Sequence, residues 1–355
     1  MATATKTKPR ITLLARADNT GLGNQTWEFY RHMKPAKTYV IDLNSVNAKM
    51  GKKTALHLER YPDGRLIEGF PPPDMCEEIL ADTDVLFTIE IPYNYLLFSM
   101  AKAKGVKTIL QYNYEFLDYL ANPTLPYPDL LLAPSKWHLA EVSKLPTRVK
   151  FVPVPTNREV ILFRARTEAK EFLHIAGHPT YFDRNGTAVV LEAMRYVKSP
   201  INLTIYCQYS IEVIGDNRIT INNIDVENYW EIYDKQFDVL LLPRRYGGLS
   251  LQLNEALAAG MPVIMTDVKP QNQFLPPGML IKSDGENIIQ TRTQIECAKP
   301  DAVALAERID YLYNHPEEVK SLSRIADDLA AETSWEALKK HYYTIAEELC
   351  QVTGQ

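Results

Sequence analysis

The chain contains 355 residues, of which 46% are hydrophobic and 23% are charged. This composition is typical of a soluble globular protein and excludes the disordered and fibrous classes, while the length is enough for two domains with separate cores. The formal net charge of −5 argues against a protein that is held on nucleic acid by bulk electrostatics.

No apolar run approaches the length that spans a bilayer, and the first ten residues lack the apolar core of a signal peptide. We therefore expect no membrane span and a cytoplasmic location. The cysteines are far apart and have no histidines beside them, which predicts neither a disulfide framework nor a zinc site: Cys76, Cys207, Cys297 and Cys350.

Charge is distributed unevenly along the chain. Residues 1–155 hold 19 Lys and Arg against 16 Asp and Glu, a balance of +3, and the remainder holds 20 against 28, a balance of −8. A local basic groove in the first half is therefore compatible with the sequence, and so is an anionic partner.

A polar tail at residues 1–9 precedes a predicted strand at 10–15, a glycine-containing loop and a helix from about Thr26. After a strand at 39–42, Asp42 completes an imitation of the dinucleotide fingerprint that begins with Gly21 and Gly23. Thr26 stands where the third glycine belongs, so the imitation is incomplete. A tight turn without a ligand is the alternative.

Further strands at 84–89, 107–112 and 130–133 are separated by helical segments, which predicts a doubly wound parallel sheet. Ligands of such sheets bind beyond the carboxyl ends of the strands. Glu115 follows one of these ends and is a candidate acceptor-side carboxylate, or else a charge that starts a helix. Pro153 and Pro155 stiffen a link near mid-chain, as suits a hinge between two domains.

The second half repeats this pattern. A strand at 172–176, a polar loop and a helix at 187–196 are followed by strands at 203–207 and 219–224. Within the loop, Arg184 can make a forked, charge-assisted contact to phosphate at any pH. His178 can do so only by donating an N–H or when it is protonated. Trp230 and Tyr233 are spaced as on a core-facing helix.

The central stretch of the chain follows an apolar strand at 237–242. A glycine pair at 247–248 allows close approach to a ligand, Ser250 is a plausible N-cap for a helix at 251–259, and Gly260 ends that helix. A strand, a glycine turn and a helix start predict an anion site, because free N–H groups and the helix dipole point at the turn. Two arginines stand at its mouth, Arg244 and Arg245.

Glu255 has no cation one turn away on its own helix, so no helical ion pair accounts for it. It is either a good helix former on a solvated face or a carboxylate that accepts hydrogen bonds from ligand hydroxyls.

The run Asn254-Glu255-Ala256-Leu257-Ala258-Ala259-Gly260-Met261-Pro262-Val263 resembles the donor-site signature of GT-B glycosyltransferases, especially family 4. The second glutamate of that signature, which holds the donor ribose, falls on Glu255. The first glutamate falls on Gly247. The resemblance implies an acceptor-side Rossmann-like domain at 10–152, a donor domain at 153–332 and a closing helix at 333–355.

The resemblance also implies transfer of a sugar from a nucleotide diphosphate, for which we expect a UDP-sugar and no metal or cofactor. Retention at the anomeric carbon is implied, although Gly247 leaves it open. The catalytic set would be Arg184, Arg245, Glu115 and Glu255. The implied donor-binding residues are Gly21, Gly23, Asn24, His178, Arg184, Asn185, Ile224, Tyr246, Gly247, Gly248, Leu249, Ser250, Leu251 and Glu255.

The Gly-Gly-Leu-Ser variant of the motif is similar to that of phage-encoded glycosyltransferases, which implies hydroxymethylated DNA or a virion protein as acceptor and the host cytoplasm as location. Two alternatives stay open. A nicotinamide-dependent oxidoreductase would explain Gly21, Gly23 and Asp42, and a GT-B protein that binds a sugar nucleotide without turnover would explain Gly247.

Overall fold

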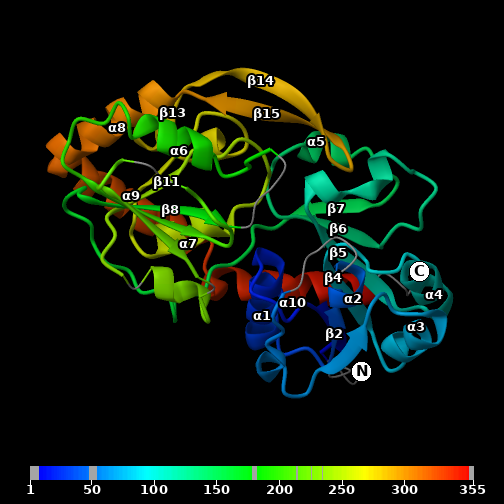
Figure 1. Ribbon diagram of the computed structural model, residues 1–355. Coiled ribbons are helices and arrows are strands. Elements are labelled where there is room, and N and C mark those ends of the chain that lie inside the picture. The colour runs from blue at the N-terminus through cyan, green and yellow to red at the C-terminus, as the bar shows by residue number, and fades with distance from the viewer. Residues whose placement is uncertain are drawn as a thin grey trace, which may run out of the picture. The chain divides into compact units, whose positions relative to one another are not determined.

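The computed structural model describes residues 8–47, 54–177, 182–212, 215–224, 226–233 and 235–351 (Figure 1). The chain divides into two compact units, one formed by residues 1–154 together with 338–355 and the other by residues 155–337. Each unit is built on its own parallel sheet, so the prediction of two doubly wound parallel-sheet domains is confirmed.

The first sheet has seven strands in the order β3-β2-β1-β4-β5-β6-β7, and all its pairs are parallel. Its central strands consist almost wholly of buried residues, as a sheet covered by helices on both faces requires. Its strands are β1 Ile11–Ala15, β2 Lys37–Asp42, β3 Arg65–Glu68, β4 Val85–Glu90, β5 Lys107–Tyr112, β6 Leu130–Ala133 and β7 Arg148–Phe151. The helices between them are α1 Gly21–Met33, α2 Asn44–Asn47, α3 Pro73–Leu80, α4 Leu96–Lys104 and α5 Leu139–Val142.

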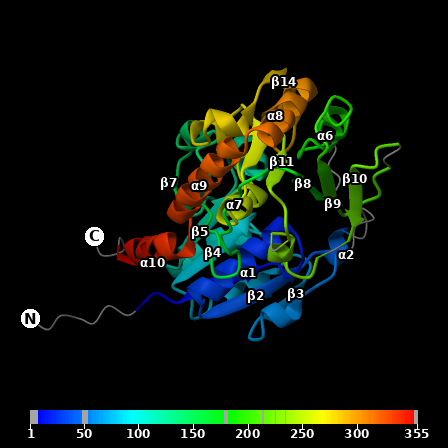
Figure 2. The same cartoon turned by 90° about the vertical axis from the view of Figure 1, so that its left-hand side faces the viewer.

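The second sheet has the order β10-β9-β8-β11-β12-β13 and is also parallel. Helix α9 packs beside α7, and α8 beside α6 (Figure 2). The strands are β8 Glu171–Gly177, β9 Asn202–Cys207, β10 Ile219–Asn223, β11 Val239–Leu242, β12 Val263–Thr266 and β13 Leu280–Ile281. The helices are α6 Thr187–Ala193, α7 Leu251–Ala258, α8 Ala302–Asn314 and α9 Pro316–Glu332.

A separate antiparallel hairpin runs out from the end of β13 (Figure 1). It consists of β14 Ser283–Gln290 and β15 Gln294–Pro300, which pair in register from Gln290 and Gln294 back to Glu286 and Ala298. The exposed residues of β14 do not form an apolar run, so the hydrophobic pattern of the sequence does not predict it.

The last helix, α10 Trp335–Gln351, begins in the second unit and packs mainly within the first. Its Tyr342 ring contacts the rings of Phe29 and Phe87, at centroid distances of 5.7 and 6.1 Å, and the Tyr343 hydroxyl donates to the Met33 carbonyl. Where the helix begins, Ser334 pairs with Thr156 in an isolated parallel bridge.

Short 3-10 segments complete the described chain: Leu58–Arg60, Tyr114–Phe116, Asp118–Leu120, Tyr229–Ile232, Gln271–Gln273 and Pro277–Met279. No described helix has both the length and the apolar character that crossing a membrane demands.

His174 is a fully buried titratable group in the middle of the second sheet. Its Nδ1 lies 2.8 Å from the Leu241 carbonyl oxygen of β11, and its Nε2 lies 2.9 Å from the Thr187 hydroxyl at the start of α6. Burial lowers the pKa of His174 below its ordinary value, because a charged imidazole is disfavoured inside the sheet.

We therefore expect the free energy of unfolding to be highest above the ordinary histidine pKa and to fall as the pH drops below it. The reason is that the unfolded chain then binds a proton that folded His174 resists. Urea unfolding at a series of pH values checks this. The substitution His174→Gln should flatten the profile, whereas His341→Gln, at an exposed position, should not. Equal profiles for all three proteins would contradict the assignment.

Candidate functional site

The second sheet contains a topological switch point between β8 and β11. From β8 the chain continues outward to β9 and β10, and from β11 it continues in the other direction to β12. Open parallel sheets bind ligands in the crevice that such a reversal leaves at the carboxyl ends of the strands. Two loops follow the carboxyl ends of these two strands, residues 182–186 before α6 and residues 243–250 before α7.

The loop before α6 packs tightly against the end of β11. A Cβ atom on Gly186, whose φ is +75°, would lie 2.3 Å from the Pro243 carbonyl oxygen. Asp183 accepts hydrogen bonds from the Thr187 and Ala188 N–H groups, both at 2.9 Å, and so caps α6. The start of α6 is therefore occupied by a carboxylate of the chain itself.

Asn185 fixes this loop to β8. Its Nδ2 donates to the carbonyl oxygens of Ile175 and Ala176, at 3.0 and 3.2 Å, which sets the orientation of the amide. Its Oδ1 is buried and has no hydrogen-bond partner among the residues that the structure describes. Arg184, next to it, is half-buried, and its carbonyl oxygen accepts from the Arg245 N–H at 2.9 Å. His178 lies outside the described residues.

Arg245 connects three segments of the second unit. Its guanidinium donates from Nη1 to the Phe182 carbonyl oxygen at 2.7 Å and from Nε to the Ala298 carbonyl oxygen at 3.0 Å. Its own carbonyl oxygen accepts from the Ala298 N–H at 2.7 Å. The sequence predicts that this cation faces a diphosphate, whereas the structure shows it bound to main-chain carbonyl groups on either side.

Ser250 caps α7, as its position in the sequence predicts, and its Oγ accepts from the Leu253 N–H at 3.3 Å. The first N–H groups of α7 have no acceptor inside the helix, and the positive end of the helix dipole lies at the same place. Four further predicted donor-binding residues are half-buried around this helix start: Tyr246, Gly248, Leu249 and Leu251.

Gly247 has a physical reason to be glycine. Its φ is +107°, and a Cβ atom there would lie 2.5 Å from Nη2 of Arg244. Arg244 is buried and cannot yield freely, since its Nε donates to the Tyr246 carbonyl oxygen at 2.8 Å. The glutamate that the family signature has at this place would therefore require both a strained backbone and a displaced guanidinium.

Glu255 is a buried carboxylate on α7. Its Oε2 accepts a hydrogen bond from the Tyr233 hydroxyl at 2.8 Å, and both residues are at least nine-tenths buried. Burial, and then the charge of Glu255, raise the pKa of Tyr233 well above its ordinary value. The absence of a cation one turn away from Glu255 in the sequence is compatible with this contact, which comes from outside α7. The aromatic spacing in the sequence predicts a core position for Tyr233 and gives no sign of its hydrogen bond to this carboxylate.

Ile224 follows β10, and half of its side-chain surface is exposed. In the first unit, Gly21, Gly23 and Asn24 lie inside the first turn of α1, where sequence reasoning expected a loop. A Cβ atom on Gly23 would lie 1.9 Å from the Asp18 carbonyl oxygen, so this glycine is required by the packing of the chain on itself.

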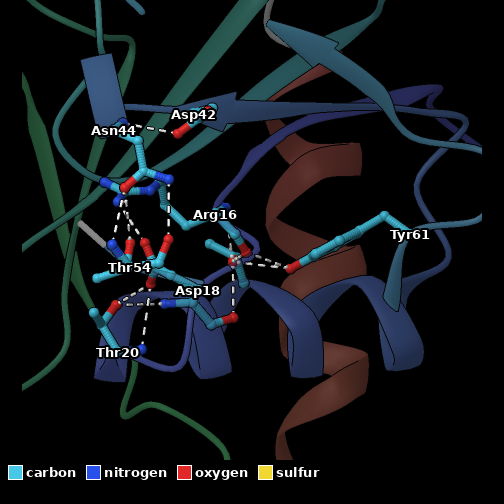
Figure 3. Close-up of polar contacts among 9 residues, drawn as sticks. Arg16, Asp18, Thr20, Asp42, Asn44, Thr54 and Tyr61 are labelled. Carbon is cyan, nitrogen blue, oxygen red and sulfur yellow. Dashed lines mark hydrogen bonds and ion pairs between the residues drawn. The ribbon is translucent and has the colours of Figure 1, made fainter. Parts of the chain in front are cut away.

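The polar groups around this helix start are tied together (Figure 3). Arg16 and Asp18 form a buried ion pair, and Asp18 also accepts from Thr20. Thr26, in place of a third glycine, shares its hydroxyl with the main chain of Arg16 and with the hydroxyl of Tyr61. The hydroxyl thus fastens α1 to the end of β1.

Asp42, which a dinucleotide site would use for ribose, accepts from the Asn44 N–H at 2.7 Å (Figure 3). Asn24 accepts from Nη1 of Arg60 at 3.4 Å, and the Arg60 guanidinium lies over the Trp27 ring, 4.4 Å from its centroid.

Glu115 is buried just beyond β5 in the first unit. On the neighbouring strand, Glu90 has φ +68° and accepts from Nδ2 of Asn113 at 3.3 Å. Non-glycine residues in this conformation are strained and cluster at functional positions. Within the described part of the chain, no three His, Cys, Asp or Glu side chains are grouped to hold a metal ion.

The contact between Gly247 and Arg244 has a measurable consequence. Gly247→Ala should lower the free energy of unfolding more than Gly105→Ala does, because a methyl group at Gly105, where φ is +73°, meets nothing within 4 Å. The backbone penalty is about 1–2 kcal/mol at Gly105, near the left-handed helical region, and about 1–3 kcal/mol at Gly247, whose φ of +107° lies outside that region. Overpacking against Arg244 adds about 1–3 kcal/mol at Gly247. Urea unfolding measures both. Equal losses would show that Arg244 yields without cost.

Part of the second unit matches a known protein family. Residues 173–328 match the family model described as glycosyl transferases group 1. No curated protein sequence is similar enough to match the chain.

Solved structures resemble it over nearly its whole length. HepE of Anabaena in complex with UDP and glucose has a TM-score of 0.67 at 9% identity and covers 95% of this chain and 99% of its own. Sucrose-phosphate synthase of Thermosynechococcus elongatus has a TM-score of 0.68 at 14% identity, with 96% and 99% covered. A glycosyltransferase of Rickettsia africae has a TM-score of 0.67 at 14% identity, and the match covers 97% of this chain and 99% of the other. The chain thus has a GT-B fold, and its residues 173–328 match the model of glycosyl transferases group 1.

Proposed function

We propose that this protein is a glycosyltransferase that moves a sugar from a UDP-sugar to an acceptor hydroxyl. The observation that carries the proposal is the arrangement at the β8/β11 switch point, where the capped start of α7 and the buried Glu255 follow one another along the same helix. The group 1 match covers this region, and a similar structure is described in complex with UDP and glucose.

In this proposal the diphosphate lies over the turn at residues 243–250. The N–H groups at the start of α7 and the Arg184 guanidinium stabilise the negative charge that develops as the sugar departs. Such electrostatic stabilisation acts without a metal ion, and we propose that none is required.

Glu255 accepts hydrogen bonds from the ribose hydroxyls. Its Oε2 is held by Tyr233, so the second carboxylate oxygen is oriented before the ligand arrives. A buried carboxylate in a fixed position loses little freedom on binding, which favours tight recognition of the nucleoside.

The acceptor side is assigned to the first unit, where Glu115 and Glu90 lie at the carboxyl ends of neighbouring strands. The balance of +3 over residues 1–155 is compatible with an anionic acceptor such as hydroxymethylated DNA, and a virion protein is the other candidate. Because of the family resemblance, we also propose that the configuration at the anomeric carbon is retained.

The donor is tested by thermal shift with UDP-, GDP-, ADP- and dTDP-sugars beside NAD, because a ligand of the folded state raises the melting temperature. We expect a shift with UDP-sugars that Arg184→Ala reduces and that the exposed control Arg195→Ala leaves intact. A shift with NAD alone would overturn the proposal in favour of an oxidoreductase. Binding without nucleotide release for any acceptor would indicate a protein without turnover.

Tyr233→Phe removes only the hydroxyl that holds Glu255. Because hydrogen bonds to charged groups contribute about 1.5–3 kcal/mol, we expect UDP to bind at least about ten-fold more weakly in calorimetric titration. Tyr313→Phe, on the same core, serves as control and should bind UDP normally. Unchanged UDP affinity in Tyr233→Phe would show that Glu255 needs no such support.

The two acceptor classes differ in their response to salt. If DNA is the acceptor, the protein should be retained on hydroxymethylated duplex DNA at low ionic strength and released as salt is raised. Absence of retention at low salt would remove DNA as the acceptor and leave the protein acceptor for direct transfer assays.

A further inference from the structure

We propose that Arg245 is a positioning residue that couples the β14–β15 hairpin to the loop bearing Arg184, and that the donor site needs the hairpin for its geometry. The inference rests on the proposed function and goes beyond it, because it makes a remote ribbon part of the nucleotide site. It also gives Arg245 a role other than direct contact with the diphosphate.

Three segments of the second unit meet at Arg245. The guanidinium reaches the Phe182 carbonyl oxygen on one side and the Ala298 carbonyl oxygen on the other. The planar fork of an arginine carries several donors in fixed directions, which suits it to bridge two acceptors at once. A lysine has one compact ammonium group and cannot reproduce that bridge.

Main-chain hydrogen bonds join the same three segments. The Arg245 N–H donates to the Arg184 carbonyl oxygen at 2.9 Å, and the Arg245 carbonyl oxygen accepts from the Ala298 N–H at 2.7 Å. Arg245 is therefore joined to the Arg184 loop and to β15 by main-chain as well as by side-chain hydrogen bonds. The Arg184 segment, the turn before α7 and β15 form one connected unit.

The residues of β15 that meet Arg245 and its neighbours are buried. Ala298 and Cys297 are almost completely buried, although most of the paired strand β14 is exposed. Burial raises the pKa of Cys297, and the charges of Arg245 and Asp183 act on this pKa in opposite directions. The base of the hairpin is thus packed beside the loop before α6, while most residues of β14 are exposed to solvent.

A consequence follows for ligand binding. If UDP orders the turn before α7 and the Arg184 loop, the hairpin base must become more protected as well, since it shares hydrogen bonds with both. Conversely, loss of the Arg245 fork frees the hairpin base and leaves Arg184 without its fixed backbone position. This coupling requires no contact between the hairpin and the nucleotide.

Hydrogen–deuterium exchange on the full chain tests the connection directly, without ligand and with saturating UDP. In the absence of ligand, Arg245→Ala and Arg245→Lys should each speed exchange at least ten-fold in residues 182–188 and 294–300, and leave α8 unchanged. In the wild type, UDP should slow exchange in residues 294–300, and this slowing should vanish in both variants. Arg195→Ala, at an exposed position, should behave as the wild type.

Calorimetric titration of both variants with UDP separates positioning from charge, because Arg245→Lys keeps the positive charge and loses the planar fork. We expect both Arg245 variants to bind UDP at least ten-fold more weakly. A lysine variant that keeps wild-type affinity would mean that charge alone matters, and it would overturn the proposal. So would unchanged exchange in residues 294–300 of the ligand-free variants, or faster exchange with UDP affinity intact.

If the wild-type protein binds no UDP, the nucleotide assignment fails. The ligand-free exchange comparison still decides whether Arg245 joins the hairpin to the Arg184 loop.

Discussion

The candidate site depends on one close approach, the packing of the loop before α6 onto the end of β11. Gly186 faces the Pro243 carbonyl oxygen where no Cβ atom fits. Because the two backbones touch, Arg184 and Asn185 on one loop lie beside Arg245 on the other, and main-chain hydrogen bonds can join them. Any side chain at position 186 would separate the loops, and the switch point between the strands would lose its two walls.

The same preference for glycine serves different ends in the two units. At Gly186 and Gly247 it brings loops and a guanidinium together around a crevice. At Gly23 it lets α1 start directly over the Asp18 carbonyl group, and the Thr26 hydroxyl then fastens that helix to the strand before it. A glycine-rich turn in a sequence therefore indicates that some other atom lies close to the backbone. Whether that atom belongs to a ligand or to the chain itself is known only from the structure.

Much of the architecture was predictable because buried parallel strands are apolar throughout, and the central strands of both sheets show this. The sequence did not reveal β3, β7 or β14, whose residues are largely exposed, nor β15, whose buried residues do not form a continuous apolar run. Within the site, the cap at Ser250 could be predicted from local spacing. The bond between Tyr233 and Glu255 and the ties of Arg245 could not, because they join residues 22 or more positions apart.

The path of the last helix has a consequence for how the protein is made. The first unit is not continuous in the sequence, since residues 338–355 belong to it although they follow the whole second unit. During synthesis its first 154 residues emerge early, yet Phe29 and Phe87 acquire the Tyr342 ring only when the final helix has been translated. The unit that begins first is thus completed last, and the intervening unit has the opportunity to fold as a whole before it.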